Sequence, residues 1–469
     1  MNDFLKKIAD ARIKKGLLNA IWDGILWAIM FGFAENYIVP FALVFGATTL
    51  QVSLIQGMAQ LGVGVAQLLG SQFIIKFRKR KQLTILTSRL HAFSWLFVFF
   101  VTFWTQNPWA ILIFYFLGVS VGNFGGPAWI SWMNDIVPEN LRGEYWGTRN
   151  RIIGIAQLVF IAIAGIVLQL AKHGGQEIFA YGILFMLAFI ARFVNFIPLT
   201  RQYEPPMSVP AFTYEFKFRI FLTKLGPTNF GRFALFSILI TFAANLIGPL
   251  VPVYILQDLD FNYIQFTIVM MAATIFASVF MTYWGPLADR YGNYRILGVA
   301  ALGLPILALS WALVKNFYLL IFVQVFSGFV WAGFNLATTN FIFDAVRREN
   351  ISKIMAYFNT LNTFCAFLGA LTGGLLVNVF SQYDLSRFWL NKFTAVFAVS
   401  ALLRIAVIVL FFSRFTEVRR VDFSPPLYFF YMYRPLLNLR NRLRAINAPF
   451  FKAGNVRHAK HPKEEQMLY

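Results

Sequence analysis

The chain has 469 residues, of which 58% are hydrophobic and only 13% charged, with 41 lysines and arginines against 20 acidic residues. Because soluble domains carry about a quarter charged residues, this composition excludes a soluble globular protein and indicates a membrane protein. The single cysteine, Cys365, excludes a disulfide framework and any metal site built on several thiolates.

The N-terminal segment, residues 1–16, is charged and has no small-residue cleavage site, so we expect a retained cytoplasmic segment and not a signal peptide. Apolar stretches long enough to span a bilayer follow it in succession, joined by short loops. Twelve can be placed, at residues 18–46, 51–75, 83–103, 108–133, 150–171, 177–199, 230–256, 262–284, 296–314, 317–343, 353–380 and 388–412. The predicted fold class is an all-α membrane protein with twelve transmembrane helices.

Basic residues gather on one side of these spans. If the N-terminus is inside, the cytoplasmic segments include the run KFRKRK at 76–81, the central loop and the C-terminal segment. The opposite loops hold only Lys172, Lys315, Arg387 and Lys392. Since cytoplasmic loops are enriched in Lys and Arg, both termini are predicted to be cytoplasmic. We interpret the net charge of +21 as a topology signal and as contact with anionic lipids, and not as nucleic-acid binding.

The chain repeats itself at a fixed offset. The phrase FAENYIVPFAL at 33–43 nearly recurs as FAANLIGPLVP at 242–252, so that Asn36 corresponds to Asn245, 209 residues later. The same offset links Asp135 to Asp344, Asn150 to Asn359 and Gly165 to Gly374. Parallel repeats of six helices are typical of transporters whose halves rock around a central site.

These repeats define the expected domains. A cytoplasmic linker rich in proline and charge separates two six-helix halves, and a basic, aromatic cytoplasmic tail follows them. The boundaries are 17–199 for the first half, 200–228 for the linker, 229–413 for the second half and 414–469 for the tail. We expect the tail to lie along anionic lipid at the inner surface.

The loop GPLADRYGNYR at 285–295 is similar to the G-x-L-A-D-R-x-G loop signature of the major facilitator superfamily. Gly285 and Gly292 are expected to permit tight turns. Asp289 is expected to accept hydrogen bonds at a helix start, and Arg290 to pair with an acid. The chain therefore resembles a transporter of this superfamily, and these motifs do not indicate a particular subfamily. The resemblance implies the twelve-helix fold in two halves. The sequence has no nucleophile–base pairing and no phosphate-cradling glycine loop, so we expect neither an enzymatic activity nor a cofactor.

A second loop, DIVPENLRG at 135–143, resembles the D/E-x-x-P-x-x-x-R-G loop of many superfamily members. Ion pairs between acids and arginines at helix ends can break when two halves rock apart. We interpret five residues as a cytoplasmic gate, with ordinary surface pairing as the alternative. They are Asp135, Arg142, Asp289, Arg290 and Asp344.

Glu35 is an acid inside the first apolar stretch, where the repeat has Ala244. An intramembrane carboxyl is costly and usually faces a cavity or a partner. A carboxyl that gains and loses a proton as the cavity opens is what proton coupling requires, so Glu35 is the candidate coupling site. The alternative is a structural acid, protonated or paired with an arginine such as Arg192, whose repeat equivalent Arg404 favours a structural role for both.

Polar residues on apolar helices outline a substrate cavity. Amides and an aromatic plane suit a polar or amphipathic organic solute, although polar packing between helices is the alternative. The candidates are Asn36, Gln56, Gln60, Asn245, Gln324, Trp331 and Asn335. Asn36 and Asn245 each stand four residues before a proline and are expected to mark interruptions of their helices. Gly118, Gly122, Gly125 and Gly126 predict close helix packing in the fourth span.

The function expected from these features is secondary active transport of a small organic solute by alternating access, coupled to protons through Glu35. One alternative is a facilitator or exporter of amphipathic or drug-like molecules, although residues 153–168 lack the proline of the drug-antiporter signature. Another is a membrane sensor that does not transport. The expected partners are a small molecule, protons and anionic lipids, with no nucleic acid and no metal. A monomer in a bacterial cytoplasmic (inner) membrane is expected.

Overall fold

The structure is a computed structural model and describes residues 8, 10–77, 79–207, 218–347, 350–385, 387 and 390–419. All regular elements in these ranges are helices. Twelve helical segments are long and apolar enough to cross a membrane, which confirms the predicted all-α fold and number of spans. The cytoplasmic position of the termini stays a prediction, and most of the tail at 414–469 lies outside the described residues.

The helices that form the first six spans, with short flanking turns, are α2 Ala11–Phe33, η1 Glu35–Tyr37, α3 Ile38–Val44, α4 Thr49–Phe77, α5 Arg80–Thr105, α6 Pro108–Phe124, α7 Gly126–Ile136, η2 Glu139–Leu141, α8 Arg142–His173, α9 Glu177–Val194 and α10 Phe196–Arg201. The later helices are α11 Phe218–Thr223, α12 Asn229–Asn245, α13 Leu250–Val253, η3 Tyr254–Asp258, α14 Tyr263–Tyr291, α15 Asn293–Leu313, α16 Phe317–Ala345, α17 Ile351–Phe380, α18 Lys392–Phe411 and η5 Phe412–Arg414.

Contacts divide the chain into two compact units. The first unit comprises Met1–Thr213 together with Pro249–Met271, and the second comprises Tyr214–Gly248 together with Ala272–Tyr469. Residues 249–271 thus associate with the first unit although they belong to the second repeat, because α13 packs against α3 and α4. The domain boundaries drawn from the repeat stay a prediction.

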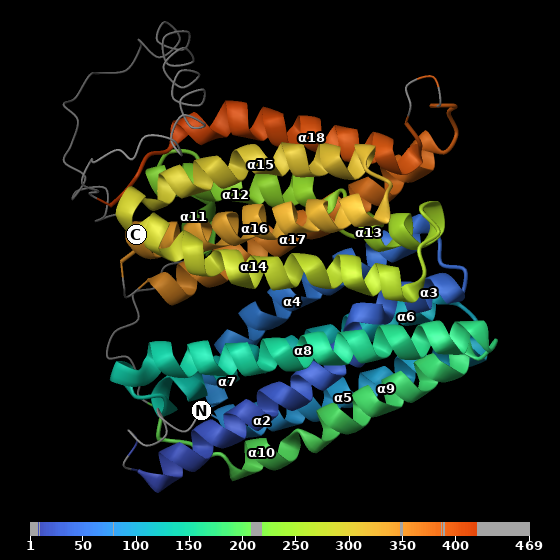
Figure 1. The fold of residues 1–469 in the computed structure, drawn as a ribbon. Coiled ribbons are helices and arrows are strands. Elements are labelled where there is room, and N and C mark those ends of the chain that lie inside the picture. Colours follow the sequence, from blue (N-terminus) through green and yellow to red (C-terminus); the bar gives the residue numbers. More distant parts are fainter. Residues whose placement is uncertain are drawn as a thin grey trace, which may run out of the picture. The chain divides into compact units, whose positions relative to one another are not determined.

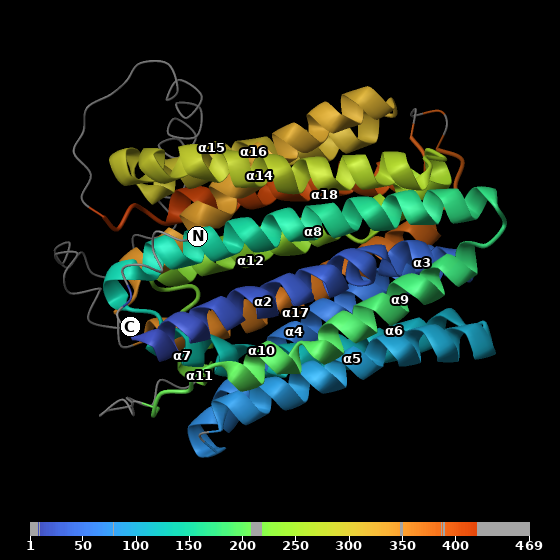
Figure 2. The same ribbon diagram turned by 60° about the horizontal axis from the view of Figure 1, so that its bottom comes forward.

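In the first unit α2 packs against both α8 and α9, and α5 packs against α6 and α9 (Figure 1). Figure 2 shows α2 beside α8 and α9 from a second direction. Glycines bring α2 and α8 into close contact. A Cβ atom at Gly24 would lie 2.1 Å from Ile153 Cδ1, and one at Gly32 would lie 2.9 Å from the backbone nitrogen of Ile161. Small residues let transmembrane helix backbones approach in this way.

The predicted glycine face on the fourth span packs against α5. A Cβ atom at Gly122 would lie 2.6 Å from His91 Nδ1, and one at Gly125 would lie 2.1 Å from Thr87 Oγ1. A Cβ at Gly126 would meet nothing within 4 Å, so this fourth glycine is not needed for packing. The polar side chains of α5 are therefore covered by glycines of α6 and of the turn after it.

The first span is interrupted near its far end. Helix α2 ends at Phe33, and Ala34 has φ −120° and ψ −59°, after which the chain continues through η1 into α3. Pro40 explains the break, because its ring clashes with the carbonyl of Asn36 in a continuous helix. The repeat behaves alike, since α12 ends at Asn245 and Pro249 precedes α13. Both predicted interruptions are present.

The loop at 285–295 differs from its expected form. Gly285 lies inside α14 and forms no turn, so that part of the prediction is wrong. Gly292 does join α14 to α15, with φ +87°, a backbone conformation that favours glycine. Asp289 lies in the last turn of α14 and not at a helix start, and its carboxylate is 3.3 Å from a guanidinium nitrogen of Arg419.

The second unit has a core built largely from aromatic rings of α12, α16 and the segment after α18. Phe233 stacks on Phe341 with ring centroids 4.1 Å apart, and Phe415 meets both edge to face. Figure 1 shows α12, α15, α16 and α18 within this unit. The core of this unit around Phe233 is thus aromatic.

Candidate functional site

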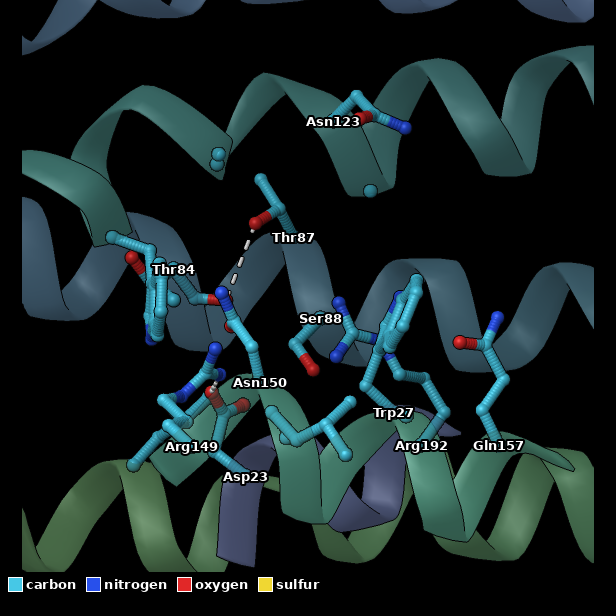
Figure 3. A pocket seen from close by; sticks show the side chains of 18 residues that line it. Asp23, Trp27, Thr84, Thr87, Ser88, Asn123, Arg149, Asn150, Gln157 and Arg192 are labelled. Atoms are coloured by element: carbon cyan, nitrogen blue, oxygen red, sulfur yellow. Dashed lines mark hydrogen bonds and ion pairs between the residues drawn. The ribbon is translucent and has the colours of Figure 1, made fainter. Parts of the chain in front are cut away.

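A cavity of about 440 Å³ lies within the first unit, between α2, α5, the α6–α7 turn, α8 and α9 (Figure 3). This volume falls within the range of small-molecule sites, about 300–1,000 Å³. The polar and aromatic residues that line it are Asp23, Trp27, Thr84, Thr87, Ser88, Asn123, Trp129, Arg149, Asn150, Gln157 and Arg192. Amides, hydroxyls, two indoles and three charged groups therefore converge on one hollow inside the membrane-spanning region.

Asp23 and Arg149 form an ion pair at this cavity. A guanidinium nitrogen of Arg149 lies 3.7 Å from a carboxylate oxygen of Asp23, whose side chain is buried. Arg149 also donates a 3.2 Å hydrogen bond to the carbonyl of Ala20, and its guanidinium carbon lies 4.4 Å from the ring centre of Trp129. The counter-ion, the carbonyl and the indole face together fix the orientation of the Arg149 guanidinium.

Arg192, near the end of α9, lies close enough to both Asp23 and Glu35 for its charge to interact with theirs. Its Nε atom is buried and has no hydrogen-bond partner among the described residues. Two acids thus share one guanidinium. Together with Arg149 the four groups sum to zero charge when all are ionised, and to plus one when one acid is protonated.

Glu35 itself lies in η1, half-buried, between the two helical parts of the first span. The next residue, Asn36, is also half-buried, and its side-chain nitrogen has no hydrogen-bond partner in the described part of the chain. Tyr37 is fully buried; its hydroxyl donates a 2.8 Å hydrogen bond to the carbonyl of Ile161 and lies 2.6 Å from Thr267 Oγ1. The coupling candidate therefore sits next to a residue that ties η1 to α8 and α14.

A polar cluster on the same unit surrounds the start of α14. Gln169 accepts a 2.9 Å hydrogen bond from the backbone nitrogen of Tyr263, and the Tyr263 hydroxyl donates to the carboxylate of Glu177. The hydroxyl of Tyr181 donates to that of Tyr263 at 3.1 Å. These bonds join α14 to α8 and α9 at the end of the unit away from Asp23.

The sequence interpretation missed Asp23 and Arg149. Arg149 stands one residue before the predicted span at 150–171, where the charge pattern indicates only one more basic residue of a cytoplasmic loop. Asp23 lies inside the predicted span at 18–46, and an acid in an apolar span is by itself a signal of a functional or paired residue. Their pairing depends on the close contact of α2 with α8, which no local pattern shows.

The other predicted cavity residues lie outside this hollow. On α4, Gln56 is half-buried and Gln60 exposed. On α12, the side-chain nitrogen of Asn245 donates a 2.9 Å bond to the carbonyl of Thr241 in its own helix. The remaining three lie on α16, where Gln324 is buried, Trp331 packs on the aromatic core and Asn335 is exposed. Their role in a substrate cavity stays a prediction.

The predicted gate residues of the first unit make contacts within that unit. Asp135 pairs with Arg80 at 2.5 Å, and Arg80 lies 3.7 Å from Glu204 as well. Arg142 pairs only locally in the described structure, with Glu139 at 3.6 Å and with the carbonyl of Asn134. Arg80 was missed as an individual residue, because the sequence shows it only as part of a basic run.

The gate residues Asp344 and Arg290 of the second unit contact neutral partners. Asp344 accepts a 2.6 Å hydrogen bond from the side-chain amide of Asn293. Arg290 lies over the ring of Tyr291, with 5.3 Å to the ring centre. The repeated arginine Arg404 is buried and donates a 2.7 Å bond to the carbonyl of Leu304, so its surroundings differ from those of Arg192. Gating by these groups stays a prediction.

Comparison with known proteins shows similarity to one family of transporters. The sequence model described as Major Facilitator Superfamily matches residues 233–440. These residues are less than half of the chain, and over them it is similar to the superfamily. Its fold agrees with solved structures of that kind: the nucleoside transporter NupG superposes with a TM-score of 0.60 at 15% identity, covering 86% of this chain and 99% of that one. A D-xylose-proton symporter gives 0.63 at 13% identity, covering 88% and 100%.

Two bacterial relatives are similar in sequence. The multi-drug resistance efflux pump PmrA of Streptococcus pneumoniae is 29% identical over 154 residues, which is 32% of this chain and 38% of the pump's length. The proton-coupled antiporter flippase LtaA of Staphylococcus aureus is 21% identical over 353 residues, 74% of this chain and 82% of the flippase. The family and these neighbours are transporters and not enzymes. The twelve apolar helices indicate a multi-pass integral membrane protein, and the bacterial origin of these relatives supports a bacterial cytoplasmic (inner) membrane.

Proposed function

We propose that this protein is a transporter of the major facilitator superfamily, a secondary active transporter that moves a small organic solute by alternating access, coupled to protons through Glu35. The observation that carries the proposal is the convergence of the Asp23–Arg149 ion pair and Arg192 on one cavity, with Glu35 close enough to Arg192 for their charges to interact. Because Arg192 interacts with Glu35, the protonation of Glu35 changes how strongly Arg192 attracts a solute group in the cavity. Proton binding and solute binding then depend on each other.

The chemistry follows from the balance of charge at the site. With Glu35 ionised, the two acids and the two arginines Arg149 and Arg192 neutralise each other. Protonation of Glu35 leaves one positive charge in excess, which favours an anionic group of a solute at the cavity. With Glu35 ionised the site is neutral and this preference is lost. The four residues therefore link binding of a proton to binding of an anionic solute group.

A second candidate function is export of amphipathic or drug-like molecules. It is favoured by the indoles of Trp27 and Trp129, which line the cavity together with the charged groups and offer apolar contact area to such a molecule. The relatives named above are an efflux pump and a proton-coupled flippase. The sensor hypothesis depends on the tail, which lies almost entirely outside the described residues. A monomer with anionic lipids at its cytoplasmic face is our expectation for the assembly.

The test is flux into liposomes that contain the purified protein, with sugars, nucleosides, organic acids and the cation ethidium as separate probes. We expect one probe class to move only while a proton gradient is present, and the Glu35→Gln variant to exchange that probe without coupling to protons. Glu139→Gln is the matched control, because the Glu139 side chain is 89% exposed and lies outside the cavity. Flux that ignores the proton gradient, or full coupling in Glu35→Gln, contradicts the proposal.

A further inference from the structure

Three charged side chains line the cavity of the first unit, and they differ in the contacts they make. They are Asp23, Arg149 and Arg192. Asp23 and Arg149 form an ion pair, and Arg149 also donates to the carbonyl of Ala20 and lies over the ring of Trp129. The donors of Arg149 are thus directed at groups of the protein, and this arginine neutralises the acid of the cavity.

Arg192 makes no contact of this kind. Its guanidinium forms no hydrogen bond and no close ion pair with any residue in the described part of the chain, and its Nε atom is buried. Asp23 and Glu35 act on it only through their charge. A guanidinium carries five N–H donors, and buried donors are nearly always satisfied. Arg192 therefore has donors left for a molecule in the cavity.

The repeat-equivalent arginine provides a comparison. Arg404 is 3% exposed and donates a 2.7 Å hydrogen bond to the carbonyl of Leu304, as expected of an arginine that holds two helices together. Among the described residues no carbonyl accepts a bond from Arg192, which lines a cavity instead. A structural role like that of Arg404 therefore does not account for Arg192.

A second donor without a partner lies in the wall of the same cavity. Ser88 on α5 is 1% exposed, and its hydroxyl makes no hydrogen bond to a described residue. Thr84 and Thr87, which line the same wall, donate instead to carbonyls of their own helix. Ser88 and Arg192 come from α5 and α9, which pack against each other, and both line the cavity (Figure 3). One hollow thus receives a free hydroxyl and a free guanidinium.

We infer that Arg192 and Ser88 bind the anionic group of the solute and that this group is an oxyanion, a carboxylate or a phosphate; the inference rests on the proposed function. The planar fork of a guanidinium matches two oxygens of such a group, and a hydroxyl can donate to one of them. Arg149 keeps Asp23 neutralised, so that this acid does not repel the anion. Trp27 also lines the cavity and offers a ring face to the rest of the solute.

The test compares matched probes by thermal-shift titration of the purified full-length protein, because a ligand that binds the folded state raises its melting temperature. The pairs are benzoate with benzamide and phenyl phosphate with phenol. Each pair has the same ring and differs in charge, and the two pairs separate a carboxylate from a phosphate. We expect the wild type to bind at least one anion about tenfold or more tightly than its neutral partner.

Two variants examine the two donors separately. Arg192→Lys keeps the positive charge and loses the planar fork, and Ser88→Ala removes only the hydroxyl. We expect each to lower the preference for the anion over its neutral partner by about tenfold. A residue that only supports the fold would lower the melting temperature without ligand and leave this preference unchanged.

The chain offers a matched control for each variant. Arg404→Lys makes the same change at the repeat-equivalent position, where a lysine can still donate to the Leu304 carbonyl. Ser53→Ala removes a hydroxyl that is likewise buried and without a partner among the described residues, but that lies on α4 and does not line the cavity. Both controls should keep the anion preference of the wild type.

An unchanged preference in either variant, or a wild type that does not prefer an anion, overturns the inference. If Arg192→Lys fails to fold, Ser88→Ala alone decides. The proposed function is tested separately, by flux of the preferred anion into liposomes. Flux that ignores the proton gradient contradicts coupling through Glu35 and leaves the oxyanion site intact. Proton-driven flux with an unchanged anion preference in Ser88→Ala overturns only the oxyanion site.

Discussion

Arg80 forms a 2.5 Å ion pair with Asp135, and the side chain of this arginine is only 1% exposed. The second repeat keeps the acid and changes its partner, since Asp344 accepts a 2.6 Å hydrogen bond from the neutral side chain of Asn293. The same structural position is thus charged in one unit and neutral in the other. Removal of each acid should therefore have different consequences.

We predict that Asp135→Asn lowers the free energy of unfolding by about 3 kcal/mol, because the buried guanidinium loses its nearer counter-ion and keeps only Glu204, at 3.7 Å. Asp344→Asn should cost only about 1 kcal/mol, since an amide can still bond to Asn293. Thermal denaturation of the two variants in the same detergent compares them directly. Equal losses of stability would show that the Arg80–Asp135 ion pair stabilises the fold no more than the hydrogen bond between Asn293 and Asp344 does.

Glu417 lies after the last span and accepts a 2.8 Å hydrogen bond from the backbone nitrogen of Tyr294. Burial raises the pKa of the Glu417 carboxyl above its ordinary value, and the backbone bonds from Tyr294, Arg419 and Val418 oppose the shift only in part. A raised folded-state pKa means that its contribution to stability is present at acidic pH and is lost as pH rises through that pKa.

The Glu417→Gln variant stays neutral, so we predict that its melting temperature gains on that of the wild type as pH rises from about 4 to about 7. A gain of about 2 °C or more corresponds to roughly 1 kcal/mol for a structural unit of this size. The measurement is a thermal melt of both proteins at several pH values in one detergent. A temperature difference that stays constant with pH contradicts the shifted pKa.

The contact between α2 and α8 at Gly32 leaves no room for a methyl group. A Cβ there would lie 2.9 Å from the backbone nitrogen of Ile161, so Gly32→Ala must push the helices apart. We predict a loss of about 1–3 kcal/mol, as for other overpacked sites. Gly154→Ala on α8 is the control, because a Cβ there meets nothing within 4 Å and alanine favours the helix. Similar melting temperatures for both variants would contradict this packing.

Tyr37 joins η1 to α14 through Thr267, whose hydroxyl also donates a 2.6 Å bond to the carbonyl of Tyr263. We predict that Tyr37→Phe increases hydrogen exchange in residues 263–267, since the start of α14 loses one of its ties to the first unit. Mass spectrometry of exchanged peptides measures this change. Tyr318→Phe serves as control, because that side chain is 70% exposed. Unaltered exchange at 263–267 means that the tie is not a stabilising one.

Local patterns predicted much of this fold. Twelve spans follow from hydropathy, and the breaks near Asn36 and Asn245 follow from prolines four residues later, because both signals act within one helix. Glu35 could be singled out for the same reason, as an acid in an apolar run. The predicted turn at Gly285 was wrong, because a loop signature does not show at which residue the preceding helix ends.

The partners of the charged residues could not be predicted. Asp23 of α2 pairs with Arg149 of α8, and Arg80 at the start of α5 pairs with Asp135 of α7. Such pairs depend on which faces of two helices contact each other. Successive residues of a helix point about 100° apart, so the sequence of one helix does not show which face meets which neighbour. The association of residues 249–271 with the first unit has the same origin, because it depends on tertiary contacts.

The most direct test of the central claim is the thermal stability of wild type and Glu35→Gln from about pH 5 to about pH 9, with sugars, nucleosides, organic acids and cationic drugs added in turn. Ligands that bind the folded state raise its melting temperature, so the shift reports binding. We predict that at least one solute class stabilises the wild type by an amount that changes with pH, and that this change is absent in Glu35→Gln. A solute that stabilises both proteins with the same pH profile would show that Glu35 does not link proton binding to solute binding.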